Sequence, residues 1–518
     1  MYNGSRDYPL YKLPKIKNLC GMMVQKTQTQ PDSIAFAWFE GDSLIKVTYR
    51  EFEKDVCKTV MNLRQAGLQK ANIGIMGKNS YKWLVLYMAI LCSGNTAVPL
   101  DRDMEADEFR DVFQRMEIRR VFIDTTCSGK AGFEDHEMGA PIFVHYNDQY
   151  NKADPFFDQE WNDEVFSCVE LVSDLNDNST ACIFLTSGTT GKRKGVMLSH
   201  ANIAADINGS CQLFELKGDT LAILPFHHAF GLIVAVWMVF HYGHTVYISQ
   251  GFRRIKKELP LVKPQTMLLV PAFVESFYKM VVMSIGKKSA VTELPNRADK
   301  AFFGGKLEYI ICGGAALDKQ YIQKYREFGV EILNGYGTTE CSPVAAANRN
   351  FYHKDGTVGL PLPDTQVTVS EESEILIAGG HVMKGYYNDL AETAEALRDG
   401  WYRTGDLGVI DDDGFITLTG RKNNLILLSS GENISPEELE EKLLRLKGIE
   451  EVVVCAREGK LTAEIYAGIG CDEVRESIKT KINELNTTLP MYKRIAVIHF
   501  REMPFEKTTS QKIIRRFN

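Results

Sequence analysis

A run of glycine, hydroxyl and basic residues occupies positions 185–195, with the sequence LTSGTTGKRKG. Glycines let a backbone approach phosphate oxygens closely, while bare amides, hydroxyls and lysines supply hydrogen bonds and positive charge. The pattern predicts a loop that holds a polyphosphate. It is not a Walker A loop, because Thr186 stands where that motif requires its first glycine. The apolar residues 181–185 predict a strand, so the loop should lie at a strand end, where α/β proteins bind ligands.

A solvated turn can have the same composition, so this interpretation depends on other segments. In residues 334–340, NGYGTTE, the ring of Tyr336 can stack on a purine. Glu340 can bind a magnesium ion that also takes phosphate oxygens. A tight turn ending in a surface glutamate is the competing interpretation. In residues 401–408, WYRTGDLG, Asp406 suits a bidentate grip on ribose hydroxyls.

Two more segments complete the set: residues 420–424, GRKNN, and residues 504–515, which contain Lys507 and Lys512. In this order and at these spacings, the five segments resemble the acyl-adenylate-forming superfamily. This superfamily includes acyl-CoA synthetases, luciferase-type enzymes and peptide-synthetase adenylation domains. The resemblance covers nearly the whole chain. Three further segments are most similar to bacterial long-chain fatty acyl-CoA synthetases: residues 7–11, 313–316 and 357–363.

The resemblance implies a two-step ligase reaction. A carboxylate, expected to come from a medium- or long-chain fatty acid, attacks the α-phosphorus of ATP and expels pyrophosphate, which gives an acyl-AMP. The thiol of coenzyme A then attacks the acyl carbon and releases AMP. ATP, Mg²⁺ and coenzyme A are the implied cofactors. The implied fold is α/β, with a large multi-sheet N-terminal AMP-binding domain (1–420, layered α/β with a β-rich part) and a small mobile α+β domain (421–518).

The resemblance also assigns roles to residues at matching positions. The phosphate-binding residues are Thr186, Ser187, Gly188, Thr189, Thr190, Gly191 and Lys194. The magnesium-associated residues are Thr186 and Glu340, and Thr339 matches a threonine that contacts the α-phosphate. The residues implied to line the adenine slot are Gly314, Ala315, Gly335, Tyr336 and Gly337, and Thr338 follows them as a further nucleotide-binding residue. The ribose-contacting pair is Asp406 and Arg421.

Two further catalytic roles follow from the resemblance. Lys512 matches the lysine that bridges the acyl carboxylate and the α-phosphate in the first step. A lysine near a chain end is usually solvated, and only the flanking residues 507–513 support this assignment. His228, in the segment 225–231, PFHHAFG, matches a histidine at the mouth of the acyl pocket. A histidine pair is more often structural, so we interpret His228 as a gate or orienting residue.

The second half-reaction requires a hinge and a mobile loop. Asn423 occupies the hinge position, where the family usually has aspartate or lysine. Asparagine tolerates unusual backbone angles, so we expect the rotation to be retained. The loop of the thiol step matches Ser430, Gly431 and Glu432. Gln511 replaces the glycine usual before the catalytic lysine, which is expected to stiffen that loop.

Several alternatives remain open at this point. A ligase that loads a carrier-protein phosphopantetheine needs the same adenylation residues. Amino-acid activation ranks lower, because Gly231 stands where such domains place the aspartate that pairs with the amino group. Aryl-acid activation and a non-catalytic nucleotide-binding regulator also rank low; the retained Lys512, Glu340 and Asp406 argue against the regulator.

The composition sets outer limits. The chain has 518 residues, a net charge of −7 and no basic stripe, which excludes nucleic acid as the principal partner. Eleven cysteines without metal-site spacing predict reduced, mostly buried thiols and a cytoplasmic location. The N-terminus lacks the apolar core of a signal peptide. The longest apolar run, 232–240, is too short to span a bilayer and predicts a buried helix or strand. Peripheral membrane contact stays open.

The elements that must position these residues alternate between helix and strand. Thr48 and Glu51 predict a capping box that opens a helix ending near residue 67. Further helices are expected at 79–91 and 107–116. Residues 128–165 and 284–305 have no clear period and predict surface excursions. Buried strands are expected at 73–77, 121–123, 221–224, 266–270 and 309–312.

The last hundred residues predict a small α+β unit. Ser435 is the expected N-cap of a helix ending near residue 447, with Pro436 at its first position and Glu438 closing a capping box. Gly448 then stops the helix. The remaining elements are a hairpin over 451–467, a helix over 472–489 and a strand over 494–500.

Overall fold

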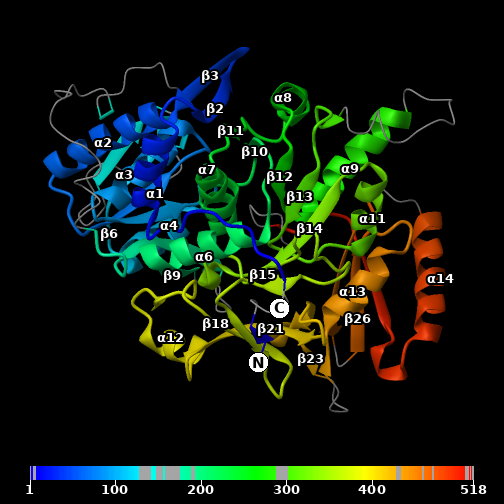
Figure 1. The fold of residues 1–518 in the computed structure, drawn as a ribbon. Coiled ribbons are helices and arrows are strands. Elements are labelled where there is room, and N and C mark those ends of the chain that lie inside the picture. Colours follow the sequence, from blue (N-terminus) through cyan, green and yellow to red (C-terminus); the bar gives the residue numbers. More distant parts are fainter. Residues whose placement is uncertain are drawn as a thin grey trace. The chain divides into compact units, whose positions relative to one another are not determined.

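The computed structural model describes residues 2–3, 8–127, 142–147, 156–157, 175–187, 193–286, 302–427, 433–457, 460–468, 472–507, 513 and 515. Figure 1 shows the fold as a mixture of sheets and helices, which confirms the predicted α/β class. The chain divides into two compact units. One comprises Met1–Gln366 and Ile377–Tyr402, and the other comprises Val367–Leu376 and Arg403–Asn518. A division by contacts does not locate a hinge, so the expected boundary at residue 420 stays a prediction.

A seven-stranded sheet of the first unit has the order β19-β9-β8-β5-β4-β6-β7. Its parallel strands are β4 (Asn72–Met76), β5 (Thr96–Leu100), β6 (Ile118–Asp124), β7 (Ile142–Tyr146) and β8 (Thr180–Ser187). Its antiparallel strands are β9 (Arg193–Ser199) and β19 (Gly385–Tyr386). The helices that connect its strands or precede them are α1 (Leu19–Thr29), α2 (Tyr49–Gln65), α3 (Tyr81–Cys92) and α4 (Ala106–Arg115).

Capping residues determine where several of these helices begin. The Thr48 hydroxyl accepts a hydrogen bond from the Glu51 amide, and the Glu51 carboxylate accepts one from the Thr48 amide, so the predicted capping box is confirmed. Ser80 caps α3, one residue later than expected. Strand β7 corrects the prediction of a surface excursion over 128–165, because residues 142–146 pair in parallel with β6. The rest of that segment, apart from residues 147 and 156–157, lies outside the described residues.

Two more sheets complete the first unit. In one, β12 (Thr266–Leu269), β13 (Tyr309–Cys312) and β14 (Glu331–Tyr336) are parallel, and β15 (Ala346–Ala347) and β16 (Leu360–Pro361) follow antiparallel. Helices α8 (Ile255–Val262), α9 (Pro271–Gly286) and α11 (Lys319–Glu327) contribute to its apolar core. The other has the order β10 (Thr220–Ala222), β11 (Val246–Ile248), β2 (Ile34–Glu40) and β3 (Ser43–Thr48).

A buried helical segment lies between β10 and β11 in the chain. The π-helix η2 (Phe230–Met238) continues into α7 (Val239–Tyr242) and contacts α6 (His200–Leu213). Gly231 and the side chains from 232 to 238 are all buried. The expectation of a buried helix or strand over 232–240 is therefore resolved as a helix. Because π-helical turns often occur at functional sites, this segment is a candidate to border a ligand site.

The second unit has its own core of Ile, Leu and Val side chains. Strands β25 (Glu451–Arg457) and β26 (Lys460–Tyr466) form the predicted hairpin, and β27 (Val497–Arg501) pairs in parallel with β26. Helices α13 (Pro436–Leu444) and α14 (Asp472–Thr488) accompany this sheet (Figure 1). Pro436 starts α13 as predicted, but the capping box is wrong: the Ser435 hydroxyl donates to the Thr419 carbonyl, and Glu438 instead pairs with Lys442.

The remaining elements are strands, one α-helix and short 3₁₀ helices. They are β1 (Tyr2–Asn3), β17 (Gln366–Val369), β18 (Glu374–Ala378), α12 (Leu390–Ala396), β20 (Leu397–Arg398), β21 (Trp401–Ile410), β22 (Ile416–Arg421), β23 (Ile426–Leu427) and β24 (Asn433–Ile434). The short helices are η1 (Thr125–Cys127), η3 (Thr339–Cys341), η4 (Lys422–Asn424) and η5 (Met491–Lys493).

The described cysteines confirm the prediction of reduced, mostly buried thiols, with one exception. Eight described cysteines are free and buried. Cys57 is disulfide-bonded, so the expectation of a reduced thiol is wrong for this residue. No helix in the described part of the chain has the length and hydrophobicity that a membrane crossing requires.

Candidate active site

Strands β8 and β9 position the predicted phosphate loop. They pair antiparallel, with Thr186 opposite Lys194 and Ser187 opposite Arg193. The register therefore brings the first threonine and the lysine of the motif to the same level of the sheet, at the carboxyl end of β8. The residues between them, Gly188, Thr189, Thr190 and Gly191, lie outside the described residues, as does the side chain of Ser187.

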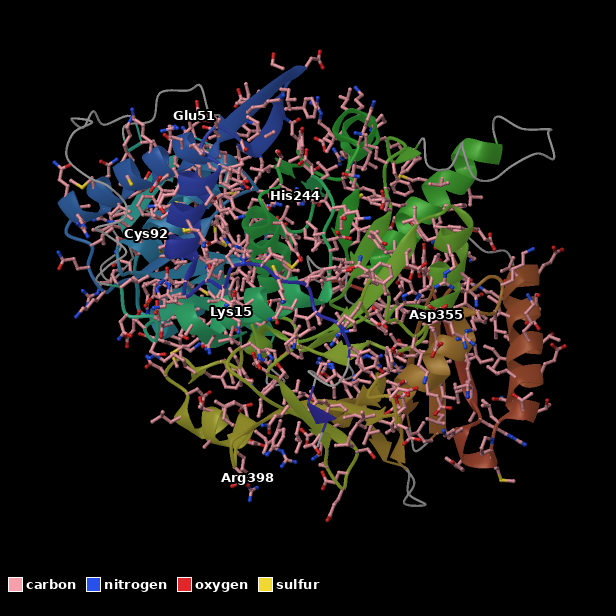
Figure 2. All side chains as sticks on the ribbon, in the orientation of Figure 1. Lys15, Glu51, Cys92, His244, Asp355 and Arg398 are labelled. Atoms are coloured by element: carbon pink, nitrogen blue, oxygen red, sulfur yellow. The ribbon has the colours of Figure 1, made fainter. Side chains whose placement is uncertain are left out.

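Lys194 has two partners from one later segment of the chain. Its ammonium pairs with the Glu392 carboxylate of α12. The same ammonium lies 5.1 Å from the centroid of the Tyr386 ring. The lysine side chain is only 17% exposed. A largely buried ammonium group needs such partners, because a charge removed from water is costly when it is unpaired. Figure 2 shows the side chains of the described residues on the ribbon.

Glu340, the residue predicted to bind magnesium, is held through both its side chain and its backbone. Glu340 lies in η3 and is 9% exposed. Its Oε1 accepts a hydrogen bond of 2.9 Å from the Tyr386 hydroxyl, and its carbonyl accepts one of 2.8 Å from the Met383 amide. The neighbouring Thr338 hydroxyl donates to the Tyr402 oxygen at 3.3 Å. The motif is thus held by tyrosines from β19 and β21.

These residues are suited to hold Mg²⁺. A carboxylate has room for about four hydrogen bonds or metal contacts, and the bond from Tyr386 uses one of them. Mg²⁺ is usually bound through one or two carboxylates together with substrate phosphates. Glu340, aided by the Thr186 hydroxyl, would hold the ion. When bound, it would neutralise charge on the phosphate oxygens.

The predicted adenine slot lies at the carboxyl ends of two adjacent parallel strands. Strands β13 and β14 pair with Cys312 opposite Asn334. Gly314 and Ala315 come after the end of β13, separated from it by one residue. Gly335 and Tyr336 end β14 and Gly337 follows it, so the topology brings both glycine segments to one sheet edge. Gly337 packs closely: a Cβ there would lie 1.9 Å from the Pro343 carbonyl oxygen. The Tyr336 side chain is buried, at 8% exposure.

The histidine segment is anchored by Asn79, which follows β4. The Asn79 side chain donates to the Leu224 carbonyl at 2.7 Å and accepts from the Phe226 amide at 3.0 Å. His228 is half-buried, and its carbonyl accepts the Leu232 amide as η2 begins. The sequence indicated Asn79 only as a helix start. Its role as an anchor has no local signal, because the partners lie about 145 residues away.

Gly231 allows no side chain in this backbone. A Cβ at this position would lie 2.3 Å from the Pro225 carbonyl oxygen. The aspartate that amino-acid-activating domains use here therefore does not fit. The ring of Phe230 lies 3.4 Å from a Cβ built on Gly313, so this segment reaches the end of β13.

The other histidine of the pair belongs to a charged cluster. His227 Nε2 lies 3.6 Å from Asp101, which is also 3.9 Å from Arg193. Burial, helped by the nearby charges of Arg193 and Arg102, lowers the pKa of His227 to about 3. His227 is therefore neutral at pH 7. Its ring lies 4.3 Å from that of His228.

The predicted ribose-contacting pair lies in the second unit. Strands β21 and β22 place Asp406 directly opposite Arg421, and Arg421 Nε donates to Asp406 Oδ1 at 2.7 Å. The aspartate side chain is 6% exposed and the arginine side chain 56%. Asn423, the predicted hinge, is exposed within η4. Ser430, Gly431, Glu432 and Lys512 lie outside the described residues.

Sequence reasoning missed Asp206 as well as Tyr386 and Glu392. Asp206 on α6 is fully buried, and its Oδ1 accepts a hydrogen bond of 2.8 Å from the Val344 amide. Val344 follows the motif that carries Glu340 by four residues. Burial raises the pKa of Asp206 well above its usual range. An aspartate inside an apolar helix pattern suggests a buried polar contact, but nothing in the sequence identifies its partner.

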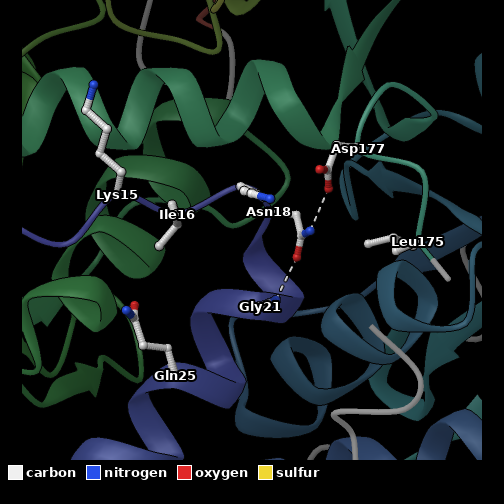
Figure 3. A pocket seen from close by; sticks show the side chains of 8 residues that line it. Lys15, Ile16, Asn18, Gly21, Gln25, Leu175 and Asp177 are labelled. Carbon is white, nitrogen blue, oxygen red and sulfur yellow. Dashed lines mark hydrogen bonds between the residues drawn. The ribbon is translucent and has the colours of Figure 1, made fainter. Parts of the chain in front are cut away.

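A separate pocket of about 370 Å³ lies at the N-terminal end of α1. Figure 3 shows the Asn18 side chain between Asp177, to which it donates at 2.6 Å, and the Gly21 amide, from which it accepts. None of the residues predicted for the site lines this pocket. Its lining residues are Lys15, Ile16, Lys17, Asn18, Gly21, Gln25, Leu175 and Asp177.

A family model described as AMP-binding enzyme matches residues 24–387, about seven-tenths of the chain. The chain therefore belongs to the AMP-binding enzyme family. The predictions of an adenylate-forming enzyme and of an AMP-forming acid–thiol ligase are confirmed.

Two curated relatives are similar over most of their length. The long-chain-fatty-acid–CoA ligase FadD15 of Mycobacterium bovis is 27% identical, over 84% of this chain and 80% of its own. The 2-succinylbenzoate–CoA ligase of Bacillus mycoides is 27% identical, over 95% of this chain and 97% of its own.

The fold also matches a solved structure. O-succinylbenzoate coenzyme A synthetase (MenE) from Bacillus subtilis, in complex with ATP and a magnesium ion, has a TM-score of 0.74. It is 22% identical, and the match covers 95% of this chain and 98% of its own. The predicted cofactors ATP and Mg²⁺ are the ligands of that structure. The third, coenzyme A, is the thiol in the names of both curated relatives.

Proposed function

We propose that this chain activates a medium- or long-chain fatty acid as its acyl-AMP and transfers the acyl group to coenzyme A. The observation that carries the choice of acid is η2, which starts two residues after His228. Its side chains from 232 to 238 are buried and none carries a charge. An alkyl chain that extends along this helix would therefore meet apolar groups, and burying apolar area is favourable by about 25 cal/mol per Å². The similarity to FadD15 supports the same choice.

The first half-reaction brings anions together, so this chain must supply positive charge and oriented donors. In the proposed arrangement, residues 186–191 and Lys194 hold the phosphates, and Thr339 contacts the α-phosphate. Lys512 bridges the acyl carboxylate and that phosphate. The carboxylate oxygen forms a bond to the α-phosphorus, and the bond to pyrophosphate breaks.

The second half-reaction consumes the mixed anhydride. The thiol sulfur of coenzyme A attacks the acyl carbon, the bond to AMP breaks, and the thiol proton is lost. Hydrolysis competes unless water is excluded. In this chain the buried apolar surface of η2 and the half-buried His228 would limit water near the acyl carbon. The loop of Ser430, Gly431 and Glu432 would admit the pantetheine arm after rotation about Asn423.

One alternative acid has specific support. A relative named 2-succinylbenzoate–CoA ligase covers more of this chain than FadD15 does. That acid carries a second carboxylate, which needs a cation or several donors when it is buried. The buried Arg349 is engaged elsewhere: it donates to the Tyr8 carbonyl at 3.5 Å and lies 5.4 Å from the Tyr8 ring. We therefore rank this acid second, and aryl and amino acids below it.

The test is acid-dependent pyrophosphate release by the purified chain with Mg²⁺ and ATP. The panel contains medium- and long-chain fatty acids, 2-succinylbenzoate, benzoate and an amino acid. The proposal expects release with fatty acids at far higher kcat/KM than with the others. Activity with 2-succinylbenzoate alone would overturn the choice of acid. No release with any acid would overturn the proposed activity.

Two further measurements complete the test. In Lys512→Ala, acid-dependent pyrophosphate release is expected to fall by about a hundred-fold or more, because one charge-stabilising donor is lost. Thioester formation from purified acyl-AMP should remain. Competition between coenzyme A and a holo carrier protein identifies the acceptor; preferential loading of the carrier would replace coenzyme A in the proposal.

A further inference from the structure

The short strand β19 brings a distant segment against the phosphate-binding lysine. It pairs antiparallel with β9, with Tyr386 opposite Val196. The Tyr387 amide donates to the Gly195 carbonyl at 2.7 Å, which extends the ladder toward Lys194. Residues two positions apart on a strand share a face of the sheet, and diagonal neighbours across a pair are within reach of long side chains. The ladder therefore sets the Tyr386 ring beside the Lys194 side chain.

Tyr386 touches both charged groups predicted to handle MgATP. Its ring face lies 5.1 Å from the Lys194 ammonium, within the range of a cation–π interaction. Its hydroxyl donates to Glu340 Oε1 at 2.9 Å. The side chain is buried, with the residue 7% exposed. A phenol is an ordinary hydrogen-bond donor at neutral pH, because its usual pKa is about 10.

The segment around Tyr386 is itself firmly held. The Tyr386 amide donates to the Thr393 hydroxyl at 2.9 Å, and that hydroxyl donates to the Asp389 carbonyl at 2.7 Å. The Asp389 carboxylate caps α12 by accepting from the Glu392 amide. Gly385 has a φ of +140°, and a Cβ there would lie 2.6 Å from the Thr393 side chain. The tyrosine is thus set by backbone bonds on both sides.

We propose that Tyr386 is a positioning residue of the adenylation step, which orients the magnesium-binding carboxylate of Glu340 through its hydroxyl and the phosphate-binding Lys194 through its ring. This inference rests on the proposed function. Without the hydroxyl, the Glu340 carboxylate loses its side-chain donor and must be ordered by the metal itself. Without the ring, the partner that the described residues still offer the Lys194 ammonium is the Glu392 carboxylate, which competes with phosphate oxygens for the same charge.

The two contacts can be separated by substitution. Tyr386→Phe keeps the ring beside Lys194 and removes only the hydroxyl, whereas Tyr386→Leu removes both. Tyr387→Phe is the matched control, because the Tyr387 hydroxyl donates to Glu117 at 3.0 Å and the same atom is deleted one residue away. The Tm of each variant is measured first. The activities of the three variants and of the unchanged chain are then compared at a temperature at which all four are folded.

In Tyr386→Phe, the Mg²⁺ concentration for half-maximal ATP–pyrophosphate exchange is expected to rise roughly ten-fold, as for loss of one hydrogen bond to a charged group. The KM of the fatty acid and kcat at saturating Mg²⁺ should change little. Tyr386→Leu should also raise the KM for ATP at saturating Mg²⁺. Tyr387→Phe should match the unchanged chain.

A binding measurement gives a readout apart from turnover. Electron paramagnetic resonance of Mn²⁺, in the presence of a non-hydrolysable ATP analogue, should show the same roughly ten-fold weakening in Tyr386→Phe. Equal Mn²⁺ affinity in Tyr386→Phe and Tyr387→Phe would overturn the inference, as would a uniform fall in kcat with an unchanged Mg²⁺ dependence. Failure of the proposed function is distinct, since the unchanged chain would then show no acid-dependent exchange.

Discussion

Asp406 and Arg421 form an ion pair across neighbouring strands of the second unit, with Arg421 Nε 2.7 Å from Asp406 Oδ1. Their register in β21 and β22 makes them direct cross-strand partners, so the strand pairing sets the orientation of the aspartate before any nucleotide binds. A carboxylate held in this way keeps its second oxygen at a fixed angle. Preorganisation of this kind lowers the ordering cost of binding.

We expect Asp406→Asn to lower kcat/KM for ATP by about ten- to a hundred-fold. The reason is loss of hydrogen bonds between ribose hydroxyls and a charged acceptor, about 1.5–3 kcal/mol. The fall in kcat/KM is measured by titrating ATP in a pyrophosphate-exchange assay. Glu374→Gln is the control, because Glu374 is equally buried in the same unit and accepts from Arg403 at 2.7 Å. An equal loss in both variants would assign Asp406 a structural role only.

Capping and turn chemistry made much of the fold predictable. The reciprocal hydrogen bonds of Thr48 and Glu51 form as expected, and the hairpin β25–β26 follows its turn signal. Strand β7 was missed because a short apolar run in an acidic segment has no helix- or strand-specific period. The capping box at Ser435 does not form, because the Ser435 hydroxyl is directed at the Thr419 carbonyl and the Glu438 carboxylate pairs with Lys442 and Lys493.

The candidate site was predictable only where a motif is continuous in sequence. Residues 334–340 form one strand end and one short helix, so their spacing carries the information. The contacts of Tyr386 with Lys194 and Glu340 join residues 192 and 46 positions apart. Long-range pairs of this kind arise from sheet register, which single-sequence patterns do not specify.

Two glycines of the adenine motif differ sharply in the space around them. A Cβ at Gly337 would lie 1.9 Å from the Pro343 oxygen, whereas at Gly335 its nearest contact would be 3.4 Å. Gly337→Ala is therefore expected to destabilise the chain by about 1–3 kcal/mol, as other overpacked substitutions do. Gly335→Ala serves as its matched control. Urea unfolding of both variants measures the difference; equal stabilities would contradict the close packing.

Four buried histidines predict loss of stability in acid. Burial lowers the pKa of His200, His241 and His381 to about 4, and that of His227 to about 3. An unfolded histidine titrates near 6.5. Between these values the unfolded chain binds protons that the native chain does not, so stability falls as the pH falls from about 6.5 to about 4. Each group contributes up to about 1.4 kcal/mol per pH unit.

The variant His381→Gln isolates one of these groups. Its free energy of unfolding should fall less steeply than that of the unchanged chain between pH 6.5 and pH 4, because one proton fewer is taken up on unfolding. Above pH 7 the two curves should run parallel. Denaturant unfolding across this range measures both slopes, and identical acid slopes would show that His381 is not held neutral.

Asn423 allows the hinge to be tested separately from the chemistry. It lies in η4, whose 3₁₀ turn is closed by the Leu425 amide donating to the Lys422 carbonyl at 3.2 Å. Proline fixes φ near −65°, which a 3₁₀ turn already uses. Asn423→Pro should therefore fit φ at this position and oppose a large change of it, at the cost of some strain at the preceding Lys422, which is also in η4. We expect pyrophosphate release to stay within about two-fold, while thioester formation from purified acyl-AMP falls by about ten-fold or more. Asn423→Gly, which leaves φ and ψ of this residue free, should support both half-reactions.

Two results would contradict this account of the hinge. Equal thioester rates in the two variants would place the hinge at another residue. Loss of pyrophosphate release in Asn423→Pro alone would mean that the backbone at residue 423 must move before the adenylate forms.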